Sequence, residues 1–211
     1  MGFRFGDIRD ATDTRYLVWM FVFAAVVVAP IAWSVRVVSW AESRRFFEPA
    51  PELVAMAGAL VFATMALGQQ YVLFSGQQIY QELPQLGDGA LWYLTFAKVG
   101  ALVIALLAGW RGGPIFPTIT SVSALAVLAA PLVDVPPDLL MVAAVASVSV
   151  VFLKGKVATG FVLSLYVVPL SNAGLILVGC VGAAVAFGVL GSIGWIPRAP
   201  EPLEGAGQQL E

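Results

Sequence analysis

Residues 16–35 read YLVWMFVFAAVVVAPIAWSV, a stretch of 20 positions without a charged side chain. A helix rises 1.5 Å per residue, so about 20 apolar residues cross the roughly 30 Å hydrocarbon core of a bilayer. The rest of the chain has the same character. Of its 211 residues 60% are hydrophobic and 11% are charged, whereas a soluble domain carries about 25% charged residues. The sequence therefore predicts an all-α integral membrane protein and excludes a water-soluble fold.

Outside this stretch, the apolar segments are of two lengths. Long segments, each sufficient for a span, occupy residues 53–74, 91–110, 114–132 and 173–193. Shorter segments occupy residues 79–83, 139–153 and 157–168. We expect a bundle of about four or five full spans with two or three broken or re-entrant helices. Short and interrupted segments point to a transport site, because irregular backbone at membrane depth needs a protein or water-filled environment.

Polar residues are concentrated at the two ends of the chain and in the connections. Residues 1–15 form a polar N-terminal segment, residues 16–195 form the transmembrane region, and residues 196–211 form a polar tail that we expect to be disordered. Lys and Arg occur in several connections, so the positive-inside rule leaves the orientation open. We expect a multi-pass protein of a bacterial plasma membrane, surrounded by the lipid bilayer.

The composition argues against several kinds of site. Histidine is absent, which removes a common metal ligand and the side chain that titrates near neutral pH. Cys180 is the single cysteine, so no disulfide forms within the chain. The net charge of -2 provides no basic face for nucleic acid. We expect no catalytic residues, no metal site, no cofactor and no enzymatic activity.

The strongest local signal is the loop GGPIFPT, residues 112–118, between two apolar segments. Glycine allows a tight turn and a close approach to a ligand, and proline suits the first turn of a helix. The free amides and the positive end of the helix dipole together favour an anion. The candidate anion-binding residues are Gly113, Ile115, Phe116, Pro117 and Thr118. The alternative is a simple turn between two spans.

Over residues 15–195 the sequence resembles the C-terminal half of the CLC family of chloride channels and Cl⁻/H⁺ antiporters. The loop Gly113-Pro114-Ile115-Phe116-Pro117 stands where that family has its G-x-F-x-P anion-binding motif. A basic residue precedes the loop, and a short helical hairpin and a long last span follow it, as in the family. The resemblance implies the fold of the second inverted repeat of a CLC channel. It also implies chloride or another small anion as ligand, and assembly as a homodimer or with a complementary N-terminal half.

The chain departs from the family pattern at the site itself. Ile115 holds the position of the motif's phenylalanine, and Pro114 has no amide to donate. The family's serine-containing loop and gating glutamate have no counterpart, and no tyrosine occurs after Tyr166. Every acidic residue lies before Leu53, in a loop or in the tail. The chain therefore offers no intramembrane carboxylate for a proton relay.

Several polar or small residues inside apolar segments have two interpretations. Lys98 has a possible electrostatic role in raising anion occupancy, or its long stem caps backbone carbonyls. The hydroxyls of Thr118, Thr120, Ser121 and Ser123 either line a pathway or, as we favour, allow tight helix packing. The glycines at positions 174, 179, 182, 188 and 191 predict close helix contacts in the last span.

These observations favour anion transport, by a channel or exchanger half that binds the anion at backbone amides of residues 113–118. A second hypothesis is a non-transporting membrane subunit or truncated CLC fragment that acts through helix contacts. The proline at Pro114 and the missing glutamate favour it. A third is a transporter for a different solute.

Overall fold

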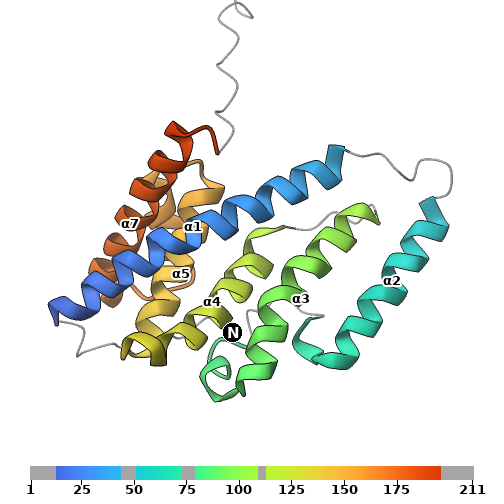
Figure 1. The fold of residues 1–211 in the computed structure, drawn as a ribbon, viewed down its shortest axis with the longest axis horizontal. Helices are drawn as coiled ribbons and strands as arrows, with labels where there is room; N and C mark the ends of the chain where they lie inside the picture. Colours follow the sequence, from blue (N-terminus) through green and yellow to red (C-terminus); the bar gives the residue numbers. More distant parts are fainter. Residues whose placement is uncertain (1–12, 44–50, 73–78, 109–112, 196–211) are drawn as a thin grey trace, which may run out of the picture.

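The computed structural model describes residues 13–43, 51–72, 79–108 and 113–195, and these residues form helices without a β-strand (Figure 1). The α-helices are α1 (Thr14–Ser43), α2 (Pro51–Gly68), α3 (Asp88–Leu107), α4 (Ile115–Val133), α5 (Pro137–Phe152), α6 (Val157–Ser164) and α7 (Ala173–Ser192). Single turns of 3₁₀ helix occupy Gln70–Val72, Leu83–Gln85 and Leu170–Asn172. The predicted all-helical class is confirmed.

Within the described part of the chain, 4 helices are long and apolar enough to cross a membrane. The candidate spans are Thr14–Val37 in α1, Asp88–Ala105 in α3, Ile115–Val133 in α4 and Leu170–Ser192, which contains α7. Helices α2 and α5 are apolar but shorter. This agrees with the predicted mixture of full spans and short helices, and it is compatible with a multi-pass membrane protein.

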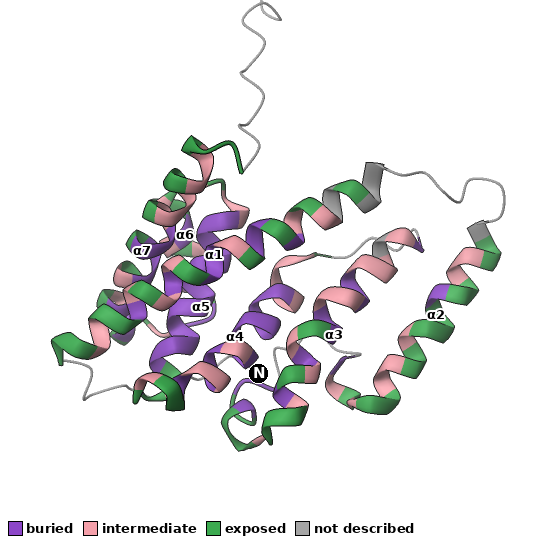
Figure 2. Cartoon of the chain, in the orientation of Figure 1, coloured by how far each residue is buried: buried purple, intermediate pink, exposed green. Residues whose placement is uncertain are grey.

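Helix α5 lies at the centre of the bundle, in contact with α1, α4, α6 and α7 (Figures 1 and 2). Its side chains from Leu139 to Val150 are at most 1% exposed. A helix that is apolar on all sides belongs in the interior. The Ser147 hydroxyl donates to the Ala143 carbonyl at 2.7 Å, which satisfies this polar group within the helix itself.

Helices α1, α5 and α7 run in the same direction (Figure 1). Early contacts join α7 to α5 and α1 at Gly179 and Gly182, and later contacts join Phe187 to Gly155 and Trp195 to Arg36. A Cβ on Gly179 would lie 2.8 Å from the Cβ of Ala146 in α5. A Cβ on Gly182 would lie 2.7 Å from the carbonyl oxygen of Phe21 in α1. These contacts confirm the prediction for two of the five glycines. The other three, Gly174, Gly188 and Gly191, have no such neighbour within 4 Å.

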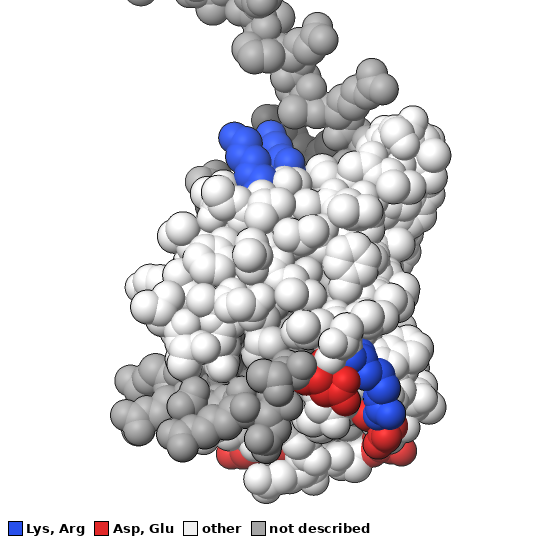
Figure 3. All heavy atoms as spheres, turned by 90° about the vertical axis from the view of Figure 1, so that its left-hand side faces the viewer, with Lys and Arg blue, Asp and Glu red and all other residues white. Residues whose placement is uncertain are grey.

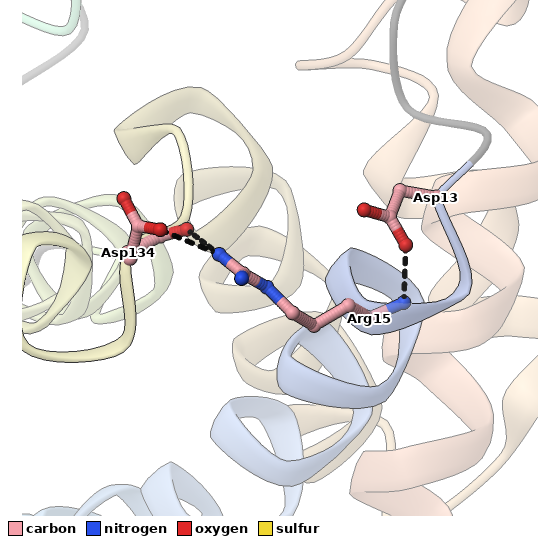
Figure 4. Close-up of polar contacts among 3 residues, drawn as sticks. All are labelled: Asp13, Arg15 and Asp134. Carbon is pink, nitrogen blue, oxygen red and sulfur yellow. Dashed lines mark hydrogen bonds and ion pairs between the residues drawn. The ribbon is translucent and has the colours of Figure 1, made fainter.

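Helix α4 packs against α3 and is tied to the start of α1 at its far end. The Ser121 hydroxyl of α4 donates to the Thr95 carbonyl of α3. Asp134 follows α4 in the left-handed conformation, with φ 53°, which Asp tolerates better than most residues. The Arg15 guanidinium donates to both the carbonyl and the carboxylate of Asp134, each at 2.7 Å (Figure 4). The start of α1 and the end of α4 therefore lie at the same end of the bundle.

Three helix ends differ from the sequence prediction. Helix α1 continues through Arg36 to Ser43, because no proline or glycine interrupts it there. Helix α2 ends at Gly68, so the span predicted for residues 53–74 is wrong. At this point Gly68 fits against the ring of Tyr93, where a Cβ would lie 2.7 Å from the ring carbon Cζ. Helix α6 ends at Ser164, and turns replace the rest of the segment predicted to end at residue 168.

The predicted re-entrant segment falls partly outside the described residues. Residues 75–78, where the sequence indicates the break, are among those not described. Residues 79–82 form turns that lead into Leu83–Gln85, and this piece is too short to cross a membrane, as predicted. The polar segment at residues 1–12 and the tail at 196–211 also lie outside the described residues.

Candidate functional site

The candidate anion site is the first turn of α4. Pro114 is the N-cap residue, and its side chain cannot cap the helix. Ile115 and Phe116 follow in the first turn, where the helix supplies no acceptor for backbone amides. The first turn contains no acidic residue. The local sequence produces this arrangement because proline has the φ of a helix start while lacking a side-chain oxygen.

The hydroxyls that follow this turn are already engaged. Thr118 directs both its amide, at 3.3 Å, and its hydroxyl, at 2.8 Å, to the Pro114 carbonyl. The Thr120 hydroxyl donates to the Phe116 carbonyl at 3.0 Å. Donors for an anion at this turn would therefore be the amides of Ile115 and Phe116. Pro117 has no amide, and Gly113 lies exposed just before the helix.

Lys98 lies fully inside the protein, with 1% of its surface exposed. Its amino group donates to the carbonyl of Val72, in the 3₁₀ turn after α2, at 3.2 Å. This contact matches the structural interpretation of Lys98 as a cap for backbone carbonyls. The Ser121 contact with Thr95 sets how α4 lies on α3, and Lys98 follows Thr95 by 3 residues while Ser121 follows Ile115 by 6. The two helices run in opposite directions (Figure 1). Lys98 and Ile115 therefore lie about 5 Å apart along the helix axes.

A buried group of hydroxyls lies further along α4, and sequence reasoning missed one of its members. Tyr80, in the turns before α3, is 6% exposed. Its phenol lies near the hydroxyls of Thr120 and Ser123, without a hydrogen bond to Ser123. The Ser123 hydroxyl has no hydrogen-bond partner among the described residues. No sequence signal pairs Tyr80 with α4, because the two segments are brought together only by the packing of the fold.

A cavity of about 470 Å³ opens between α1, α3 and α4. Four residues with hydroxyl groups, Ser34, Thr95, Thr118 and Ser121, contribute to its wall. Each of these hydroxyls donates to a backbone carbonyl, so none presents its hydrogen to the cavity. The cavity is therefore apolar, and these hydroxyl groups do not offer hydrogen-bond donors to an anion inside it.

Metal ligation has no support in the described residues. No group of three or more His, Cys, Asp or Glu side chains in that part of the chain is placed to hold a metal ion. Cys180 is buried within α7 and belongs to the core.

The fold and the site define a class, a multi-span helical bundle in which an uncapped helix start follows a glycine-proline loop. Comparison with known proteins does not narrow this class, since no family model, curated protein or solved structure matches the chain.

Proposed function

We propose that this chain is one half of a CLC-like anion channel or exchanger, and that it holds chloride or another small anion at the amides of Ile115 and Phe116. The observation that carries the proposal is the start of α4, which has neither a side-chain cap nor an acidic residue in its first turn. Helices α2, α3 and α5 each have an acidic residue there, namely Glu52, Asp88 and Asp138, whereas α6 and α7 share both features of α4 but follow no glycine-proline loop. The combination of this helix start with the loop at Gly113 and Pro114 favours an anion at the positive end of α4.

The exposure of the loop supports a requirement for a partner. Residues 114–117 are half-buried and Gly113 is exposed, whereas the following residues 118–124 are buried. An anion at these amides needs further cover, which a complementary N-terminal half or a second copy of the chain would provide. Gly174 and Gly188 of α7 also have open space beside them, where a partner helix can approach closely.

The test replaces Pro114 with two different residues. Pro114→Asp places a carboxylate at the N-cap, where it accepts hydrogen bonds from the first-turn amides and competes with the anion. We expect bromide binding, measured by calorimetry on protein in lipid nanodiscs, to weaken at least tenfold. Pro114→Ala adds one amide without adding a cap, so we expect binding to be retained or to become tighter.

Both variants keep the helix intact, because Asp at an N-cap stabilises a helix and Ala is compatible with it. A difference in binding therefore reports on the site and not on folding. If the wild-type chain binds no bromide, or if the two variants bind it equally, the proposed anion site is wrong.

A second candidate is a non-transporting membrane subunit that acts through helix contacts. It is favoured by Pro114, which has no amide, and by the engagement of Lys98 with the Val72 carbonyl. It predicts that halide flux through the assembled complex is unchanged when Gly113 or Pro114 is replaced by a bulky residue. Loss of flux in these variants would exclude it.

A further inference from the structure

The charged residues of the described chain separate into two ends of the bundle, which the linear sequence does not show. Helices α1, α5 and α7 all begin at one end, and the Arg15 contact with Asp134 places the end of α4 there as well. Helices α1, α5 and α7 finish at the opposite end, where the Arg36 guanidinium lies 5.9 Å from the centre of the Trp195 ring. Figure 3 shows basic side chains without acidic neighbours at one end of the molecule, and acidic side chains beside a basic one at the other.

The end at which α1, α5 and α7 begin is the acidic end. Its acidic side chains are Asp13, Glu82, Asp88, Asp134 and Asp138. Glu82 and Asp88 belong to it because α3 packs against α4 and runs in the opposite direction (Figure 1), so the start of α3 lies towards the end of α4. Among the described residues, the basic side chain at this end is that of Arg15, which is paired with Asp134. The described part of this end therefore carries a net negative charge.

The opposite end is the basic end, and it carries Arg36, Lys154 and Lys156, all exposed, together with the acidic Glu52 at the start of α2. The two lysines lie in the tight turn between α5 and α6. Lys154 has φ 57° and Gly155 has φ 80° in this turn. Gly155 is held against Phe187, near the end of α7, where a Cβ would lie 2.8 Å from the ring. The turn therefore lies beside the end of α7, at the same end of the bundle as Arg36.

Exposed aromatic side chains lie towards both ends of the bundle. Trp19 and Trp92 are in the first turns of α1 and α3, towards the acidic end. Trp40 and Trp195 lie towards the basic end. Tryptophan is enriched at the two interfaces between hydrocarbon and water, where its amphipathic ring is stabilised. The two charged ends therefore lie at the level of the two headgroup layers.

We propose that the bundle is inserted with its basic end in the cytoplasm, and that Arg36, Lys154 and Lys156 contact anionic phospholipid headgroups of the inner leaflet. Lys and Arg are enriched in cytoplasmic connections of membrane proteins. The cytoplasmic leaflet is negatively charged and attracts each nearby basic residue. Lys98 does not enter this comparison because it is buried within a span. The inference is independent of the anion site.

The orientation is tested with two serines at opposite ends of α7. Ser171 lies exposed before α7 at the acidic end, and Ser192 lies exposed at its last residue. In a Cys180→Ala background, we introduce Ser171→Cys or Ser192→Cys, which leave all charges unchanged. A membrane-impermeant maleimide should label Ser171→Cys in intact cells and Ser192→Cys only in inverted vesicles. The reverse pattern, or labelling of each site from both sides, overturns the orientation.

The headgroup contact is tested on purified protein. In nanodiscs of phosphatidylglycerol and phosphatidylcholine, native mass spectrometry gives the ratio of the two lipids that remain bound. Neutralising Arg36, Lys154 and Lys156 to Gln should reduce the preference for phosphatidylglycerol by about fivefold per charge. The matched control, with Lys154→Arg and Lys156→Arg, should keep the preference. Equal retention by the Gln and Arg variants overturns the headgroup contact.

Discussion

The contact between α1 and α7 makes a quantitative prediction for Gly182→Ala. A Cβ at this position would lie 2.7 Å from the carbonyl oxygen of Phe21 and 3.2 Å from its Cα. Both atoms belong to the backbone, so rotation of a side chain does not relieve the clash. The two helices must separate, and their packing along the whole contact must adjust.

The magnitude follows from two opposing effects. Overpacking of a close contact costs about 1–3 kcal/mol, whereas replacing glycine by alanine inside a helix gains about 1 kcal/mol. We expect a net loss of about 1 kcal/mol for Gly182→Ala. Gly188→Ala is the matched control on the same helix, because no neighbouring atom lies within 4 Å of its Cβ position. We expect this variant to be as stable as the wild type, or up to about 1 kcal/mol more stable.

Unfolding in mixed detergent micelles, titrated with dodecyl sulfate and followed by circular dichroism, measures both variants under the same conditions. The difference between them isolates the cost of the close approach, since both carry the same chemical change. Gly182→Ala should unfold at a lower dodecyl sulfate fraction than Gly188→Ala. Equal midpoints would refute the close packing of α1 against α7.

Two further predictions concern polar contacts in the loops and spans. At about 11 Å, the separation given by packed helix axes and this offset along them, and an effective dielectric constant of about 20, the Lys98 charge would stabilise an anion at the start of α4 by about 1.5 kcal/mol. Lys98→Met should weaken bromide binding about tenfold and Lys98→Arg should not, whereas unchanged binding in Lys98→Met would limit the residue to its contact with the Val72 carbonyl. The hydrogen bond from Tyr71 to Glu82 raises the pKa of the Tyr71 phenol. The neutral phenol therefore stabilises the fold at pH values below its ordinary pKa. This contribution is lost as the pH rises through the raised pKa. Glu82→Gln should lower the pH at which Tyr71 ionises. The measurement is the difference in tyrosinate absorbance between the wild type and the variant during a pH titration. Identical titrations would contradict this contact.

The apolar spans could be predicted from the sequence because segment length and composition determine them. Helix α4 was predicted to within one residue at each end, since prolines mark its start and an Asp-Val-Pro-Pro run follows it. The end of α2 was not predicted correctly, because residues 69–74 are apolar enough by composition to continue a span. The helix stops instead where Gly68 meets the Tyr93 ring, which is a tertiary contact.

The central position of α5 also depends on tertiary structure. Its 16 residues are too few for a span, and this supported the prediction of a broken helix. Length alone does not distinguish a short helix at the surface from one surrounded by neighbours. Its Ala and Val side chains allow α7 to approach closely at Gly179, and this packing places α5 inside. The pairing of Tyr80 with Thr120 and Ser123 was missed for the same reason.

The geometry of α4 constrains how an anion would be held. Because Thr118 and Thr120 bond to carbonyls of their own helix, backbone amides are the donors that the first turn can offer. A partly dehydrated anion is costly in a medium of low dielectric constant unless several donors surround it. Two amides at the half-exposed residues Ile115 and Phe116 supply only one side of such a shell. An anion held at these amides would therefore need a second protein surface over the loop.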